Sequence, residues 1–139
     1  MTYDAFNGID GSRYKIMIVD DIPINTRLLE KILDKGGFAI YTFNDSQQAI
    51  DSVAAIDPDI ILLDVMMPGL DGLTFLTRVR GDHSRDHTRV IMVSAVSESE
   101  EILRAGQLGA NDYIAKPVNA KSLTASIATQ IKIIDQNRA

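Results

Sequence analysis

Residues 60–72 read IILLDVMMPGLDG, and this stretch predicts a buried strand that ends in a carboxylate. Its first four residues form an apolar run that lacks the polar alternation of a half-exposed strand and is too short for an independent helix. Such a run is typical of a strand in a parallel sheet covered on both faces. The run ends at Asp64, and Pro68 and Gly69 follow, so we expect the next helix to begin only near Gly72.

Four other short apolar runs resemble this one. They occupy residues 16–19, 39–43, 90–93 and 113–115. Between and after the runs lie five segments whose apolar residues recur at helical spacing. The first segment has an apolar stripe formed by Ile24, Leu28, Leu29, Ile32 and Leu33. Five strand–helix alternations without a break in composition predict one α/β domain, a doubly wound five-stranded parallel sheet with five helices.

The composition is that of a single globular domain. The chain has 139 residues, of which 45% are hydrophobic and 24% are charged. It has no cysteine, which excludes disulfides, thiolate zinc sites and a cysteine nucleophile. A formal net charge of −5 argues against a nucleic-acid-binding surface, and no apolar run approaches the length of a transmembrane helix. We therefore expect a cytoplasmic protein without a direct nucleic-acid or membrane partner.

The N-terminal residues differ from the rest of the chain. Residues 1–13 read MTYDAFNGIDGSR, with several turn-forming residues and no sustained periodicity. The segment has no apolar stretch long enough for a signal peptide. We expect a flexible leader over residues 1–13, followed by the folded domain over residues 14–139.

The residues that end the apolar runs are candidates for function, because sites in open parallel sheets form beyond the carboxyl ends of the strands. Four of the five runs end in charged or hydroxyl-bearing residues, which are Asp20 with Asp21, Asp64, Ser94 and Lys116. The remaining run ends in Asn44 and Asp45, which we interpret as an ordinary helix cap. Three carboxylates, a hydroxyl and an ammonium group are therefore expected to meet at one edge of the sheet.

This set of groups fits one chemical task. Carboxylates repel one another and are seldom gathered without a cation, and Mg²⁺ takes oxygen ligands while keeping several waters. With the metal bound, an aspartate can attack a phosphoryl group as a nucleophile. A lysine and a hydroxyl can then hold the phosphoryl oxygens, because such chemistry consists mainly of positioning and charge stabilisation.

Each residue alone also fits a structural role. Asp20 or Asp21 could be the N-cap of the following helix, Ser94 a strand-end hydroxyl and Lys116 a surface lysine. A cap is a poor explanation of Asp64, since the next helix begins well after it. The functional interpretation depends on the four strand ends fitting the same task.

Four motifs resemble the receiver domains of two-component response regulators. They are IMIVDDIPIN at residues 16–25, IILLDVMMPGLDG at 60–72, VIMVSA at 90–95 and DYIAKPV at 112–118. The resemblance covers residues 14–134, and the order, spacing and strand-end placement of the motifs all agree with it. It implies a flavodoxin-like sheet with strand order 2-1-3-4-5.

The resemblance also implies a phosphoacceptor and a Mg²⁺ site. Asp64 matches the aspartate that is phosphorylated in the family. Asp20 and Asp21 match the acidic pair that serves Mg²⁺, with Asp21 favoured as the direct ligand. Met66 stands where the family contributes a backbone carbonyl to the metal, so the identity of its side chain need not matter.

Three further residues match family positions that respond to phosphorylation. Ser94 matches the switch hydroxyl, Lys116 the lysine that pairs with the phosphate, and Tyr113 the aromatic residue that turns inward on activation. The bond between Lys116 and Pro117 is expected to be cis, an isomer that proline permits at modest cost.

The function implied is that of a signalling switch. The phosphoryl group would come from a histidine kinase or a histidine phosphotransfer protein, and phosphorylation would change the surface presented to an output domain or a downstream protein. A homodimer that forms on phosphorylation is also compatible with the resemblance. The domain would catalyse only its own phosphorylation and dephosphorylation, so we do not class it as an enzyme.

Two other functions remain open. A Mg²⁺-dependent phosphatase with an aspartyl nucleophile usually carries an Asp-x-Asp pattern on its first strand and a cap over the substrate. Here the first strand ends in adjacent aspartates, and 139 residues leave little chain for a cap. A phosphorylation-independent interaction module would have no need of the complete acid, serine and lysine set.

The two histidines of the chain, His83 and His87, are four residues apart. This spacing could suggest a metal site. The segment follows Gly81, however, and it is predicted to be a loop rather than a helix that presents one face. We therefore interpret it as a solvated loop.

Overall fold

The computed structural model describes residue 6 and residues 8–83, 87–95 and 99–138. Within these residues, five parallel strands form one sheet in the order β2-β1-β3-β4-β5. The strands are β1 (Lys15–Val19), β2 (Ala39–Phe43), β3 (Ile60–Asp64), β4 (Arg89–Ser94) and β5 (Asp112–Ala115). Each predicted strand is confirmed to within a residue at its ends, and so is the order of the strands.

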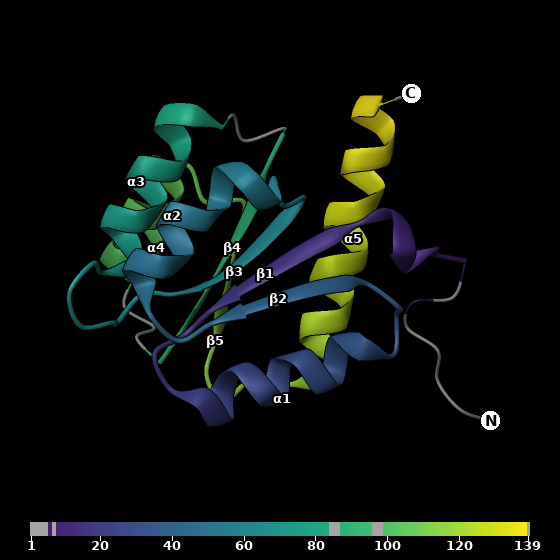
Figure 1. The fold of residues 1–139 in the computed structure, drawn as a ribbon, viewed down its shortest axis with the longest axis horizontal. Helices are drawn as coiled ribbons and strands as arrows, with labels where there is room; N and C mark the ends of the chain where they lie inside the picture. Colours follow the sequence, from purple (N-terminus) through teal and green to yellow (C-terminus); the bar gives the residue numbers. More distant parts are fainter. Residues whose placement is uncertain (1–5, 7, 84–86, 96–98, 139) are drawn as a thin grey trace.

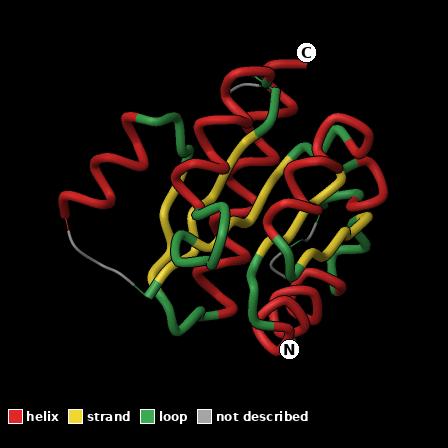
Figure 2. The backbone as a smooth tube through the Cα atoms, turned by 60° about the vertical axis from the view of Figure 1, so that its left-hand side comes forward, coloured by secondary structure: helices red, strands yellow, loops and turns green. Residues whose placement is uncertain are grey.

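In the described part of the chain, five α-helices alternate with the strands and cover both faces of the sheet (Figure 1). They are α1 (Pro23–Asp34), α2 (Ser46–Ile56), α3 (Gly72–Asp82), α4 (Ser99–Gln107) and α5 (Ala120–Arg138). Helices α1 and α5 lie on one face, and α2, α3 and α4 lie on the other. Figure 2 shows the strands running between these two helical layers. Among the described helices, none is long and apolar enough to cross a membrane.

The strands alternate their side chains between two apolar cores. From β1, Ile16 and Ile18 pack into the cluster that contains Leu33 of α1 and residues of α5. Met17 and Val19 point the other way, into the cluster with α2, α3 and α4. Both faces are therefore buried, which explains why the runs lack polar alternation. The edge strand β2, in contrast, has no fully buried residue.

The apolar stripe predicted on α1 is only partly buried. Leu29 and Leu33 belong to the core, whereas Ile24 is 69% exposed and Leu28 is 49% exposed. The helix rests on the sheet along one line, so apolar residues beside that line remain at the surface. Periodicity identifies a common side of the helix but does not say how much of that side is covered.

The described part of residues 1–13 contacts the domain, and the division into a leader and a domain stays a prediction. Phe6 is 6% exposed and its ring meets that of Phe38 edge to face, with centroids 5.1 Å apart. Gly11–Arg13 form a short 3-10 helix, η1, that is capped by the side chain of Asp10. The burial of this aromatic residue joins the described part of the segment to the core.

The packing of Phe6 predicts a stability difference. Phe6→Ala should lower the free energy of unfolding by about 2–4 kcal/mol, because it removes a large side chain from the core. Ile24→Ala, at an exposed position on α1, should change it by no more than about 0.5 kcal/mol. Urea unfolding of both variants checks this. Equal, small effects would show that the segment contributes no more than a flexible leader would.

Candidate functional site

Four candidate residues meet at the carboxyl edge of the sheet. Asp20 follows β1, Asp64 ends β3, Ser94 ends β4 and Lys116 follows β5. The strand register pairs the end of β3 with β4 and the end of β4 with β5. The grouping inferred from strand ends therefore corresponds to a real juxtaposition in space, since parallel strands all finish at the same edge.

Three carboxylates form an acidic cluster at this edge. Asp20, Asp21 and Asp64 each offer one oxygen, and these oxygens lie within 4.8 Å of one another. Asp20 is 2% exposed and Asp64 is 5% exposed, whereas Asp21 is half-buried. Negative charges held this close with little water between them need a positive partner.

The ammonium group of Lys116 is that partner within the chain. Its Nζ lies 2.9 Å from Oδ2 of Asp20 and 3.5 Å from Oδ2 of Asp64. Lys116 is followed by Pro117 through a cis peptide bond, as expected from the sequence. Among the described residues, this ammonium group is paired with two of the three carboxylates, so the cluster retains negative charge.

The burial of Asp64 affects its ionisation. Burial raises the pKa of the Asp64 carboxyl above its ordinary value, and the nearby Asp20 carboxylate adds to the rise. The Lys116 ammonium and the N–H of Met66 act in the opposite direction but do not cancel it. Ionised Asp64 is therefore held at a cost in free energy.

Asp20 is fixed by hydrogen bonds that the sequence did not reveal. Its Oδ1 accepts the N–H of Ile22 at 2.9 Å, and its Oδ2 accepts the amide of Asn25 at 3.2 Å. The side-chain amide of Asn44 donates to the backbone carbonyl of Asp20 at 2.8 Å. The sequence predicts a helix cap formed by Asn44 and Asp45. Asp45 does cap α2, whereas Asn44 binds the backbone of Asp20. The position of Asn44 just after a strand is the one feature of the sequence that points to this contact.

Neither Asp20 nor Asp21 is the N-cap residue of α1, which was the structural alternative for this pair. The N-cap of this helix is Ile22, which makes no side-chain capping bond. By contrast, Asp45 does cap α2 and Asp71 caps α3, each through its carboxylate. Asp20 therefore contacts the start of α1 through Ile22 and Asn25 while it also belongs to the acidic cluster, and neither aspartate is the N-cap residue.

The backbone around Asp64 is held by close contacts. The N–H of Met66 donates to Oδ1 of Asp64 at 3.3 Å, while the Met66 side chain is 63% exposed. Gly72, at the start of α3, lies against the same backbone. A Cβ at Gly72 would lie 2.3 Å from the carbonyl oxygen of Asp64, so only glycine fits there without movement.

Ser94 ends β4, the strand that pairs with β3, and Tyr113 is the second residue of β5. Ser94 is completely buried, and its carbonyl accepts the N–H of Lys116 at 2.8 Å. Tyr113 is half-buried and packs against the core formed with α2, α3 and α4. Their predicted switch roles concern a change of state and stay predictions.

With this geometry in place, the comparisons with known proteins identify the family. The profile described as response regulator receiver domain matches residues 16–128. The chain belongs to this family. The receiver-domain assignment made from the four motifs is therefore confirmed.

Curated relatives of this receiver domain differ in length. Response regulator PleD of Caulobacter vibrioides is 35% identical over 86% of this chain and 27% of PleD. Chemotaxis protein CheY-3 of Vibrio cholerae is 36% identical over 78% of this chain and 85% of CheY-3. DNA-binding response regulator MtrA of Mycobacterium tuberculosis is 30% identical over 94% of this chain and 56% of MtrA. The chain thus spans about a quarter of PleD and about half of MtrA.

Solved structures agree on the fold. The BeF3-activated DrrB receiver domain is 25% identical, with a TM-score of 0.78 over 86% of this chain and 97% of that one. A signal receiver domain from Vibrio parahaemolyticus has a TM-score of 0.82 over 90% of this chain and 95% of that one. At 24% identity, this second likeness shows the fold alone.

The raised pKa of Asp64 predicts how stability depends on pH in the metal-free receiver domain. A carboxyl whose pKa is higher in the folded state costs stability when ionised, and the cost disappears once pH falls below its unfolded pKa. In chelator, Asp64→Asn should therefore be more stable than wild type at pH 7, and the difference should shrink as pH falls towards 4. Urea midpoints measured across this range check it.

Asp51→Asn is the matched control, because Asp51 is an exposed carboxylate on α2. It should show no comparable gain at pH 7. An Asp64→Asn variant that is no more stable than wild type at pH 7, or a gain that grows in acid, would contradict the predicted cost of ionised Asp64.

Proposed function

We propose that this receiver domain is a phosphorylatable switch in which Asp64 accepts a phosphoryl group from a phosphohistidine donor in a Mg²⁺-dependent reaction. The observation that carries the proposal is the position of Lys116. Its ammonium group lies within reach of both Asp64 and Asp20 at an edge where three carboxylates gather. A nucleophilic carboxylate, a cation-binding pair and a group that binds phosphoryl oxygens are then adjacent.

The chemistry of the donor set fits Mg²⁺. This ion prefers oxygen ligands and is usually held by a small number of carboxylates while it keeps several waters. Asp20, Asp21 and Asp64 would hold it, together with the backbone carbonyl of Met66. The negative charge that Lys116 leaves unbalanced supports this assignment. Bound Mg²⁺ would supply positive charge that offsets both the carboxylates and an incoming phosphoryl group.

The residues of the chain would then carry out the transfer. A carboxylate oxygen of Asp64 forms a bond to phosphorus while the bond between phosphorus and the donor imidazole nitrogen breaks, and the imidazole leaves. The N–H of Met66 holds Oδ1 of Asp64, and Oδ2 faces Lys116. We propose that Lys116 and the hydroxyl of Ser94 bind the phosphoryl oxygens after transfer.

Phosphorylation would be read at the surface of the domain. We propose that Ser94 and Tyr113 rearrange when Asp64 is modified, because Ser94 ends the strand that pairs with β3 and Tyr113 lies on β5, the strand that leads to Lys116. A histidine kinase or a histidine phosphotransfer protein would supply the phosphoryl group. An output domain, a downstream protein or a second copy of the chain would recognise the altered surface.

Phosphorylation by a small donor tests the proposal. With acetyl phosphate and Mg²⁺, the intact protein should gain the mass of one phosphoryl group, and peptide mapping should place it on Asp64. Excess chelator should abolish the gain, and Asp64→Asn should stay unmodified. Asp71→Asn, on the same loop but serving as a helix cap, should be labelled as wild type is.

The outcomes separate the alternatives. Steady release of phosphate without an accumulating adduct would indicate the aspartyl phosphatase instead. No labelling of wild type with Mg²⁺ present would indicate an interaction module that does not depend on phosphorylation. Labelling of Asp64→Asn would reject Asp64 as the acceptor.

Lys116 should be separable from metal binding. Lys116→Ala is expected to bind Mg²⁺ with a dissociation constant similar to or lower than that of wild type, because the ammonium group no longer competes for Asp20. Its phosphorylation rate should fall by roughly 10²-fold, since a charge that stabilises the transferred group is missing. A Mg²⁺ titration followed by NMR gives the first quantity, and adduct formation gives the second.

Lys121→Ala, at an exposed position on α5, is the control and should match wild type in both measurements. If Mg²⁺ affinity collapses in Lys116→Ala, the lysine organises the acidic cluster and does not act mainly on the phosphoryl group.

A further inference from the structure

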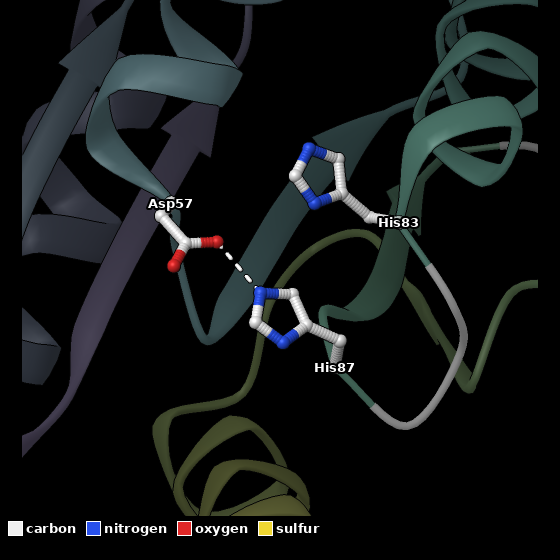
Figure 3. A group of neighbouring side chains, drawn as sticks. All are labelled: Asp57, His83 and His87. Atoms are coloured by element: carbon white, nitrogen blue, oxygen red, sulfur yellow. Dashed lines mark hydrogen bonds and ion pairs between the residues drawn. The ribbon is translucent and has the colours of Figure 1, made fainter.

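A second group of three side chains of the kind that bind metals lies at the opposite end of the strands, where the amino ends of β3 and β4 lie. Asp57 is the C-cap residue of α2, His83 is the C-cap residue of α3, and His87 lies shortly before β4. One carboxylate oxygen and one nitrogen from each imidazole lie within 4.8 Å of one another (Figure 3). Asp57 lies shortly before β3, and Asp64 is the last residue of β3. The length of this strand therefore separates the three side chains from the acidic cluster.

The three side chains face one another closely. Nε2 of His87 lies 2.7 Å from Oδ1 of Asp57. The two imidazole rings are nearly parallel, with an angle of 14° between them and centroids 5.7 Å apart. The sequence suggests only a solvated loop around the two histidines. It gives no sign of Asp57, because this residue is thirty positions away from His87 in the sequence. Two imidazoles with a carboxylate form a ligand set that zinc uses in proteins.

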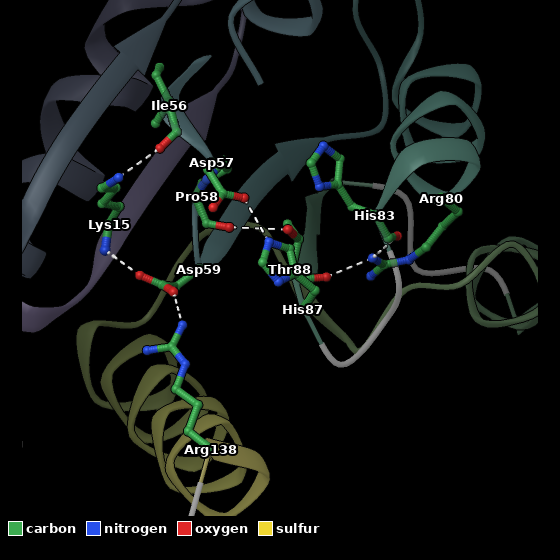
Figure 4. Close-up of polar contacts among 10 residues, drawn as sticks. All are labelled: Lys15, Ile56, Asp57, Pro58, Asp59, Arg80, His83, His87, Thr88 and Arg138. Carbon is green, nitrogen blue, oxygen red and sulfur yellow. Dashed lines mark hydrogen bonds and ion pairs between the residues drawn. The ribbon is translucent and has the colours of Figure 1, made fainter. Parts of the chain in front are cut away.

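Hydrogen bonds hold the backbone beside the two histidines. The guanidinium group of Arg80 donates to the carbonyl of His83 at 3.2 Å and to the carbonyl of Thr88 at 2.6 Å (Figure 4). The hydroxyl of Thr88 donates to the carbonyl of Pro58 at 3.1 Å. The segment after α3, the start of β4 and the segment after α2 are therefore tied together directly beside the three ligand residues.

The backbone on the other side of Asp57 is also fixed. Nζ of Lys15 donates to the carbonyl of Ile56 at 3.0 Å, and the N–H of Asp57 donates to Val53 at 2.8 Å. Asp59, the next acidic residue, is engaged by the N–H of Lys15 and by Arg138, so it does not compete for the same position. Sites whose ligands are supported in this way need little reorganisation to bind an ion.

Asp57 is suited to be the anionic ligand. It is the C-cap of α2 and has a φ of 53°, which turns the chain sharply at this point. The hydrogen bond with His87 holds the pKa of the Asp57 carboxyl below its ordinary value. The carboxylate is thus ionised at neutral pH and half-exposed at the surface.

We propose that Asp57, His83 and His87 bind a divalent transition-metal ion of the zinc class. The ligand atoms of a tetrahedral zinc site are about 3.3 Å apart. The contact between His87 and Asp57 is shorter than this, and every separation is below 4.8 Å, so the ligand atoms are close to the spacing that zinc requires. Water would complete the coordination. Imidazole ligands favour zinc, nickel or copper over Mg²⁺, so the two ends of the sheet differ in metal preference.

The site predicts zinc binding that is independent of the acidic cluster. Zn²⁺ is titrated into the full chain with excess Mg²⁺ present to occupy the carboxylates near Asp64. Isothermal titration calorimetry should give one equivalent of bound Zn²⁺. The chain has two histidines and both belong to the site, so the imidazole signals in the NMR spectrum report on it directly. Both sets of signals should shift.

Variants of the three ligands decide the assignment. His83→Gln, His87→Gln and Asp57→Asn should each weaken Zn²⁺ binding at least about tenfold. Asparagine is chosen at residue 57 because it tolerates the left-handed backbone found there. Asp82→Asn, an exposed acid at the end of α3 outside the group, is the control and should bind as wild type does. Urea midpoints in chelator establish that each variant is folded.

Two results would overturn the proposal. One is that the imidazole signals of wild type do not move with a stoichiometric amount of Zn²⁺. This result needs no variant and would leave only a hydrogen bond between His87 and Asp57. The other is undiminished binding in any one of the three ligand variants, because the proposed ion needs all three side chains.

Discussion

The burial of two carboxylates at one edge of the sheet is the constraint on which this receiver domain depends. Asp20 and Asp64 are almost completely removed from water, and a charge so placed costs free energy unless it is paired or hydrogen-bonded. Lys116, the start of α1 and the N–H of Met66 supply those partners. Segments almost a hundred residues apart in sequence are thereby drawn to a single cluster of charges.

The same cluster is incompletely balanced, and this links stability to function. The raised pKa of Asp64 shows that burial outweighs the attraction of Lys116. A bound divalent cation would offset the negative charge that is left over in the folded chain and would also offset the charge of an incoming phosphoryl group. The cost of the metal-free state and the proposed reactivity of Asp64 therefore have one physical origin.

Parallel strands give the two edges of the sheet different groups of connections. Strand-to-helix connections gather at the carboxyl edge and bring carboxylates and an ammonium group together there. Helix-to-strand connections gather at the amino edge and bring Asp57, His83 and His87 together. Oxygen ligands at one edge and imidazoles at the other suit different ions, so the two proposed sites would differ in the metal ion that each prefers.

Local pattern was enough to predict the strands, their helices and the main candidates for function. A strand buried on both faces must be apolar along its whole length, and the charged residue that ends such a run must lie at an edge of the sheet. Asp64 and Lys116 could be grouped for that reason alone. Hydrophobic periodicity likewise placed Leu29 and Leu33 on the buried side of α1, and both belong to the core.

Tertiary structure decided the contacts that join distant residues. Asn44 holds the backbone of Asp20, Gly72 leaves room for the backbone of Asp64, and Phe6 packs on Phe38. A hydrogen bond to a backbone carbonyl, a close approach of two chains or a single buried ring leaves no periodic signal in a sequence. Asp57 meets the histidines for the same reason: the folded chain sets their separation, whereas the sequence records only that thirty residues lie between Asp57 and His87.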